Sequence, residues 1–235
     1  FSVSAYTAIF KSGNVPRSFL NSVYYTALGT AINMLLTTMM AYPLSRTYLT
    51  FRKFYNVLVL ITMFFSGGLI PTFLTVKSLG LYNTVWAIVL PGAISTWNLI
   101  IMRTFFMGLP AELEESAQLD GANDFTIFAR IILPLSKASI ATIALFYGVG
   151  HWNNWFSGMI YFKNSKSYPL QTILRSIVIN SEVSDEITVD EVINSISAEG
   201  IKYSTLVVSM VPMMAVYPFI QKYFVKGIMI GSIKG

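Results

Sequence analysis

The run FLNSVYYTALGTAINMLLTTMMAYPL, residues 19–44, decides the class of fold. It carries no charged side chain, and it is longer than the roughly 20 mainly apolar residues that an α-helix needs to cross a bilayer. A charge at the middle of a membrane helix costs about 2.5–3.5 kcal/mol on insertion scales, so segments that contact lipid avoid charges. The run therefore predicts a transmembrane α-helix.

Further apolar runs of similar length follow along the chain. They cover residues 54–76, 82–102, 135–156 and 205–223. The whole sequence is 54% hydrophobic and only 11% charged, whereas soluble domains carry about 25% charged residues. We therefore predict an all-α, polytopic transmembrane helical bundle with five spans, forming a single membrane domain over residues 1–235.

Charge and composition exclude several other classes of protein. The formal net charge is +5, but the basic residues are scattered beside apolar runs and form no polar face, so we expect no nucleic-acid partner. The chain has no cysteine, which excludes disulfides, thiolate metal sites and cysteine nucleophiles. Its single histidine, His151, has no acid nearby in the sequence, so we also expect no metal site.

The basic residues between the runs predict how the chain is oriented. The turn 45–53, the region 103–137 and the C-terminal tail are richer in Lys and Arg than the turn around Lys77. The positive-inside rule places these three segments in the cytoplasm and the start of the chain outside. The long loop 157–203 then lies outside, and we expect its acidic stretch 181–200 to form a short helix or an ordered loop.

The segment 109–125, LPAELEESAQLDGANDF, predicts two short helices joined at Gly121. Three early glutamates complement the positive N-terminal end of the first helix, and Gly121 favours the left-handed conformation that ends a helix. Asn123 or Asp124 then caps the second helix, which we expect Pro134 to stop.

Two phenylalanines of the second helix, Phe125 and Phe128, predict an exposed apolar knob. A patch of this kind, when lipid does not cover it, usually binds a partner. From these residues alone, an ordinary amphipathic loop on the membrane surface remains an alternative.

A spaced pattern in this segment resembles a known family. The residues Glu115–Ala117 (ESA), three residues, Gly121, nine residues and Ile131–Pro134 (IILP) resemble the EAA signature of binding-protein-dependent ABC importer permeases: EAA, three residues, G, nine residues, I-x-L-P. Ser116 departs from the alanine of that pattern but is nearly as small. Asp120–Ala122 also match the common D-G-A form.

The resemblance implies a type I ABC importer permease fold, in which this loop docks into a groove of a separate ATPase subunit. The loop then transmits nucleotide-driven closure to the membrane helices. The resemblance assigns docking to Glu115, Ser116, Ala117, Asp120, Gly121 and Ala122, and the exposure argument adds Phe125 and Phe128.

The expected partners follow from the same resemblance. The sequence contains no G-x-x-x-x-G-K-[ST] phosphate loop, so we expect ATP and Mg²⁺ to bind to the partner ATPase. The chain itself is then a non-catalytic subunit without a cofactor. The family implies a heterodimer with a second, similar permease, two ATPase subunits and an extracytoplasmic solute-binding protein, all at a prokaryotic inner membrane.

Other stretches resemble the carbohydrate-uptake branch of the family. They are Asn21-Ser22, residues 41–46 (AYPLSR), Trp152-Asn153 and the ending 221–227 (QKYFVKG). This branch includes the smaller maltose-type permease subunit and a subgroup for complex oligosaccharides. It implies import of a carbohydrate, with an oligosaccharide favoured, by alternating access, and a non-sugar solute is the alternative. Members usually have six spans, so we expect a further span before Phe1.

Amide and aromatic side chains supply candidates for the translocation path. They are Asn98, His151, Trp152, Asn153, Asn154 and Trp155. Aromatic faces and amides suit the C–H groups and hydroxyls of a sugar, but Trp also favours the membrane interface. Asn98 and Asn33 lie within apolar runs, where bridging between helices is the favoured alternative.

Three rival functions fit less well. A proton-coupled carrier generally needs ionisable groups inside its spans, and no acid lies there, although sodium coupling through carbonyls stays open. A membrane enzyme would need paired catalytic groups, and the acids in 112–124 and 182–199 have no histidine beside them. A passive channel would not explain an ATPase-docking signature.

Overall fold

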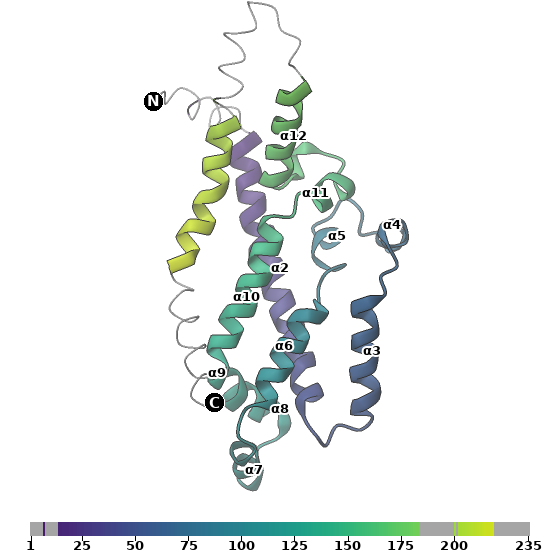
Figure 1. Ribbon diagram of the computed structural model, residues 1–235, viewed down its shortest axis with the longest axis vertical. Coiled ribbons are helices and arrows are strands. Elements are labelled where there is room, and N and C mark those ends of the chain that lie inside the picture. Colours follow the sequence, from purple (N-terminus) through teal and green to yellow (C-terminus); the bar gives the residue numbers. More distant parts are fainter. Residues whose placement is uncertain (1–6, 8–13, 184–199, 201, 219–235) are drawn as a thin grey trace, which may run out of the picture. The chain divides into compact units, whose positions relative to one another are not determined.

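The computed structural model describes residue 7 and residues 14–183, 200 and 202–218 of the chain. Every regular element in this described part is helical (Figure 1), so the all-α prediction is confirmed. The chain divides into two compact units. Unit 1 contains residues 1–29, 73–91 and 148–219, and unit 2 contains residues 30–72, 92–147 and 220–235.

The first apolar run forms helix α2, Asn14–Ser45, which passes from unit 1 into unit 2. Its portion Val15–Ser45 is long and apolar enough to cross a membrane. At its C-terminal end, Arg52 donates from Nε to the carbonyl of Leu44 (3.2 Å) and from Nη2 to that of Ser45 (3.3 Å). These bonds satisfy carbonyls that a helix end leaves without partners.

Two of the predicted spans contain a break between two helices. Run 54–76 forms α3, Arg52–Phe64, and α4, Leu69–Ser78, separated at Gly68, whose φ of +84° suits only glycine without strain. Run 82–102 forms α5, Trp86–Val89, and α6, Thr96–Met107. Pro91, which lacks an N–H, and Gly92 lie between α5 and α6 and break the helix.

The run that follows is also divided between two helices. Run 135–156 forms α10, Lys137–Trp152, and the start of α11, Phe156–Tyr161. A 3₁₀ turn, Ser165–Ser167, and α12, Leu170–Val183, follow. A last helix covers residues 202–218.

In the described part of the chain, one helix could span a membrane by its length and composition, or up to three segments if each bent helix pair counts as one. The count of five spans therefore stays a prediction. The remainder of run 205–223, the acidic residues 184–199 and the ending 221–227 lie outside the described residues.

Unit 2 has a core between the end of α2, helix α6 and the segment that follows α6. In this unit α3 lies alongside α6 (Figure 1). The fully buried side chains include Phe106, Leu99, Met102, Ile127, Ile132 and Ile143. After α6 come α7, Glu112–Leu119, α8, Asp124–Ile127, a π-helical turn η1, Phe128–Ile132, and α9, Leu133–Leu135.

Pro134 does not stop the second helix of the 109–134 segment, contrary to prediction. It lies in the first turn of α9, where a proline is tolerated because the missing N–H would have no partner there. The helical path instead breaks at Ser136, whose hydroxyl donates to the carbonyl of Ile132 (2.6 Å).

Unit 1 is held together by long-range polar contacts as well as by apolar packing. Asn21 donates from Nδ2 to the carbonyls of Lys166 (2.9 Å) and Tyr168 (3.1 Å). Ser22 Oγ accepts from the backbone N–H of Leu170 (2.8 Å). These bonds join the beginning of α2 to the 3₁₀ turn and to the first residue of α12.

Candidate coupling site

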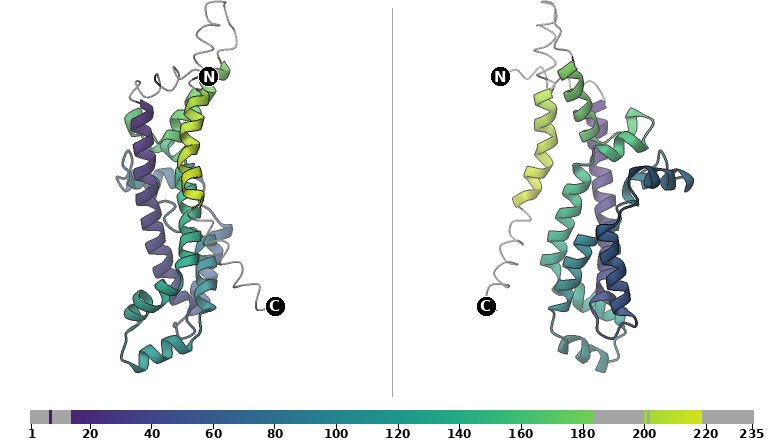
Figure 2. Two further views of the ribbon diagram at one scale, coloured as in Figure 1. Left: turned by 90° about the vertical axis from the view of Figure 1, so that its left-hand side faces the viewer. Right: turned by 45° about the vertical axis from the view of Figure 1, so that its right-hand side comes forward.

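The segment with the EAA-like spacing folds as two short helices joined at Gly121, as predicted. Gly121 has φ +80°, and the N–H of Ala122 donates to the carbonyl of Ala117 (2.9 Å), which closes the end of α7. Asn123 caps α8, because its Oδ1 accepts from the N–H of Thr126 (2.8 Å). In both views of Figure 2, α7 lies beyond the C-terminal end of α2.

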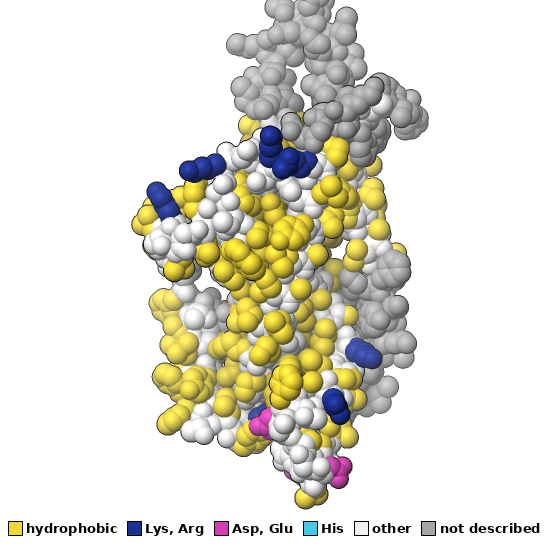
Figure 3. Space-filling view, turned by 180° about the vertical axis from the view of Figure 1, so that it is seen from behind, with side chains coloured by type: hydrophobic (Ala, Val, Ile, Leu, Met, Phe, Trp, Pro, Cys, Tyr) yellow, Lys and Arg dark blue, Asp and Glu magenta, His cyan; other side chains and the backbone are white. Residues whose placement is uncertain are grey.

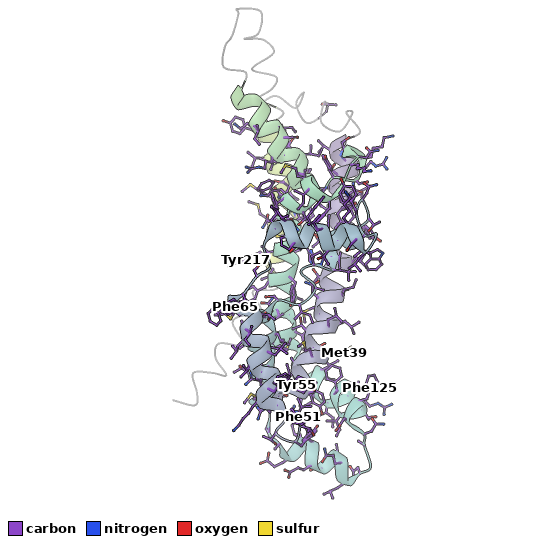
Figure 4. The ribbon with its side chains drawn as sticks, turned by 90° about the vertical axis from the view of Figure 1, so that its right-hand side faces the viewer. Met39, Phe51, Tyr55, Phe65, Phe125 and Tyr217 are labelled. Carbon is purple, nitrogen blue, oxygen red and sulfur yellow. The ribbon has the colours of Figure 1, made fainter. Side chains whose placement is uncertain are left out.

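Large apolar side chains on this loop face outward. Leu119 is 89% exposed, Phe125 is 71% exposed and Leu113 is also exposed. Figure 4 shows Phe125 projecting from α8 away from the other helices. Burying one such side chain is worth about 1.5–3 kcal/mol, so each of them favours burial against a partner.

The prediction that Phe125 and Phe128 are both exposed is wrong for Phe128. Phe128 is only 8% exposed, and its ring centroid lies 5.2 Å from that of Tyr42 at the end of α2. The apolar surface instead combines Phe125 with Leu113 and Leu119, which the sequence reasoning missed. Their signal was present: both are leucines in an otherwise polar helix.

The two alanines of the motif are placed differently from its other residues. Ala117 and Ala122 are half-buried and pack against the core of unit 2. The exposed members are Glu115, Ser116, Asp120 and Gly121. The alanines thus let the loop approach the core, and the exposed members are available to another protein.

A buried ion pair joins the loop to α2. Nη2 of Arg46 lies 2.5 Å from Oε1 of Glu114, and both residues are less than a tenth exposed. The guanidinium carbon of Arg46 also lies 4.9 Å from the ring centroid of Tyr42, a cation–π contact. Burial raises the pKa of the Glu114 carboxyl, and the charge of Arg46 offsets part of that effect.

A second contact joins the chain after α2 to α8. The phenol of Tyr48 donates to Oδ1 of Asp124 (3.3 Å), and burial together with a contact to Tyr42 raises the pKa of Tyr48. Beside this contact lies a pocket of about 300 Å³. Its lining comprises Met39, Tyr42, Pro43, Tyr48, Leu49, Asp124, Phe125 and Phe128.

The acidic side chains visible in Figure 3 gather near α7, at one end of unit 2. Hydrophobic side chains cover much of the remaining face in that view. Within the described residues, no three His, Asp or Glu side chains lie close enough to hold a metal ion. The loop therefore combines negative charge with exposed apolar groups.

The tryptophan and asparagine cluster lies in unit 1. Some of its side chains are buried and others are exposed. Trp152 is 3% exposed, and its Nε1–H donates to the carbonyl of Ser209 (3.0 Å). Asn154 Oδ1 accepts from the N–H of Ser157 (3.1 Å). Asn153 is exposed, and Trp155 is partly exposed.

His151 and Trp155 each have a close neighbour in unit 1. His151 lies at a close approach between α10 and α2, because a Cβ on Gly29 would fall 2.5 Å from His151 Nε2. Arg175 lies over the ring of Trp155, with 3.8 Å from the guanidinium carbon to the ring centroid. The sequence reasoning missed this second pair because twenty residues separate its members.

The two asparagines of the apolar runs lie in unit 2. Asn33 is buried and donates from Nδ2 to the carbonyl of Gly92 (3.1 Å), which supports the bridging interpretation. Asn98 is also buried, and its backbone N–H donates to Oγ of Ser95 at the start of α6.

Comparison with known proteins identifies the class. Residues 3–230 match the family described as "Binding-protein-dependent transport system inner membrane component", and the chain belongs to this family. It is therefore a multi-pass inner-membrane permease subunit of an ATP-driven importer and a non-catalytic component of that transporter.

Particular relatives agree with this class. The chain is 47% identical over 236 residues to Protein LplC of Bacillus subtilis (strain 168), covering 100% of this chain and 80% of LplC. It is also 47% identical over 236 residues to the polygalacturonan/rhamnogalacturonan transport system permease protein YtcP of the same organism, covering 100% and 82%. A solved bacterial ABC transporter involved in import of the acidic polysaccharide alginate contains a chain with TM-score 0.87 and 32% identity, with coverage of 95% of this chain and 80% of that one.

Proposed function

We propose that this permease imports an oligosaccharide that contains sugar acids. The observation that carries the proposal is that YtcP is named for polygalacturonan and the solved relative for alginate, and both polymers are chains of uronic acids. Family membership favours ATP as the energy source over the ion gradient that the sequence left open.

Coupling to the ATPase is assigned to the α7–α8 loop. The proposal gives the docking contacts to Glu115, Ser116, Ala117, Asp120, Gly121, Ala122 and Phe125, with Leu113 and Leu119 added from their exposure. Phe128 is given an internal role, holding η1 against the end of α2. Support comes from the spacing of the motif and from the exposed apolar surface of the loop.

The substrate path is assigned to the exposed part of the tryptophan cluster. Asn153 offers an amide to sugar hydroxyls, and Trp155 offers an aromatic face. Arg175, stacked on Trp155, adds a cation that suits a uronate carboxylate. Trp152, Asn154, His151 and Asn98 then act by supporting the path.

Family membership also supports a proposal for the assembly. We infer five spans in this chain and a heterodimer with a second permease. Two ATPase subunits bind ATP and Mg²⁺, and an extracytoplasmic binding protein delivers substrate to the loop 157–203. The turn 45–53 and the loop 109–134 face the cytoplasm, and alternation between two discrete arrangements moves the sugar.

Uptake competition tests the substrate class. Cells that carry the complete importer are given labelled oligogalacturonate, with unlabelled oligogalacturonate, a neutral oligosaccharide or an amino acid as competitor. The proposal predicts competition by the uronate oligomer alone. Competition by the neutral sugar alone would remove the acidic-sugar assignment, and competition by the amino acid alone would remove the carbohydrate assignment.

A further inference from the structure

The end of α2 and the beginning of α7 carry opposite charges that face each other. Arg46 directly follows α2, and Glu114 lies in the first turn of α7. A helix is electronegative at its C-terminal end and electropositive at its N-terminal end. Each side chain therefore complements its own helix end while it pairs with the other residue.

This ion pair is sealed from water and oriented by aromatic rings. Arg46 and Glu114 are both nearly fully buried, and Arg46 rests on the ring of Tyr42. That ring contacts Phe128 (5.2 Å between centroids) and Phe106 (6.5 Å). The end of α2, α6, α7 and η1 therefore meet at one cluster.

A buried ion pair is weak evidence for stability, because apolar residues of similar volume often stabilise a protein as well or better. What a paired guanidinium and carboxylate provide is a fixed mutual geometry. Here that geometry links a loop with an exposed apolar surface to α2, the helix of the described part that is long enough to cross a membrane by itself.

We propose that the Arg46–Glu114 pair, seated on Tyr42, is the joint through which displacement of the α7–α8 loop moves α2. The inference rests on the proposed coupling function of this loop. Arg46 and Glu114 are positioning residues, since they act through the helices and do not contact the substrate. Loss of the joint leaves the ATPase docked and active but breaks the link between ATP hydrolysis and transport.

Charge variants test the joint in the complete importer reconstituted in liposomes. Three quantities are measured: ATPase retained on the purified permease, ATP hydrolysis stimulated by the binding protein, and sugar transported per ATP hydrolysed. Glu114→Gln and Arg46→Gln each lower transport per ATP at least about tenfold, while the retained ATPase stays within about twofold of wild type. Glu112→Gln, which removes an exposed glutamate from the same turn, leaves all three unchanged.

Wild-type transport per ATP in both single variants overturns the joint. Loss of the retained ATPase in the single variants overturns it too, because the pair would then belong to docking. Absence of ATPase from the wild-type permease would instead contradict the proposed coupling function itself.

A covalent link between the two positions tests the joint in a way that does not depend on whether the charge variants fold correctly. The chain has no cysteine, so Arg46→Cys with Glu114→Cys gives a unique thiol pair. The pair variant transports poorly when reduced, and bridging by a bifunctional thiol reagent that spans the replaced side chains raises transport per ATP several-fold. No gain on bridging, with the link verified by mass spectrometry, contradicts the joint.

Discussion

The sequence predicts functional residues both in the α7–α8 loop of unit 2 and in the tryptophan cluster of unit 1. The two regions differ in how far their large apolar side chains are exposed. In the loop, Leu119 and Phe125 are strongly exposed. In the cluster, Trp152 is buried with its N–H bonded to Ser209. An aromatic residue that the fold itself uses says little about a ligand, whereas an exposed apolar one calls for a partner.

The largest expected effect comes from breaking the turn of the loop. Gly121 has φ +80°, and proline fixes φ near −65°, so Gly121→Pro abolishes the turn. Ala117→Arg places a long cation where a half-buried alanine packs. Each variant lowers ATP hydrolysis stimulated by the binding protein at least about tenfold, equal to about 1.4 kcal/mol or more of lost docking.

The control for this change is Gly92→Ala. A Cβ on Gly92 would meet no atom within 4 Å, so this variant keeps wild-type stimulation. Normal stimulation in both Gly121→Pro and Ala117→Arg would remove the docking role of the loop.

The next effect separates the two phenylalanines of the loop. Phe128→Ala creates a cavity beside Tyr42 and lowers the free energy of unfolding by about 3–5 kcal/mol, measured by thermal unfolding in detergent. Phe125→Ala leaves the unfolding temperature nearly unchanged and weakens ATPase association instead. Equal loss of stability in both variants would contradict the assigned difference between a packing residue and a contact residue.

A smaller effect is expected at Leu119. Replacing this exposed leucine by serine removes apolar area worth up to about 1.5–3 kcal/mol if a partner buries it. We expect Leu119→Ser to weaken binding of the purified ATPase roughly tenfold in a titration, with no loss of permease stability. Unchanged affinity would place Leu119 outside the docking surface.

The smallest effects are expected in the tryptophan cluster of unit 1. Asn154→Ala removes the acceptor for the N–H of Ser157 and costs about 1 kcal/mol of stability. Asn153→Ala leaves stability unchanged and raises the KM for sugar uptake. A variant pair with the reverse pattern would show that Asn154, and not Asn153, contacts the substrate.

The sequence predicted the parts of the molecule that short-range chemistry determines. The turn at Gly121 and the cap at Asn123 were predictable because a left-handed glycine and an asparagine cap have local causes. Helix α2 was predictable because its apolar run has no internal breaker before Pro43.

The features that the sequence did not predict have long-range or composite causes. Runs 54–76 and 82–102 matched a membrane span in composition, but Gly68 and the Pro91-Gly92 pair interrupt them. Burial of Phe128 depends on Tyr42, which lies far away in sequence. The Arg46–Glu114 pair depends in the same way on a helix end and a later loop meeting in space.

Site-specific cross-linking tests the central claim most directly. Because the chain lacks cysteine, the Phe125→Cys and Asn153→Cys permeases each carry one thiol, and each is purified and assembled with its partner subunits before cross-linking. A thiol-to-amine reagent of short reach is predicted to join the ATPase subunit to the Phe125→Cys permease and not to the Asn153→Cys permease. A cross-link only from position 153, or labelling of position 125 by a membrane-impermeant maleimide added outside intact cells, would contradict the account.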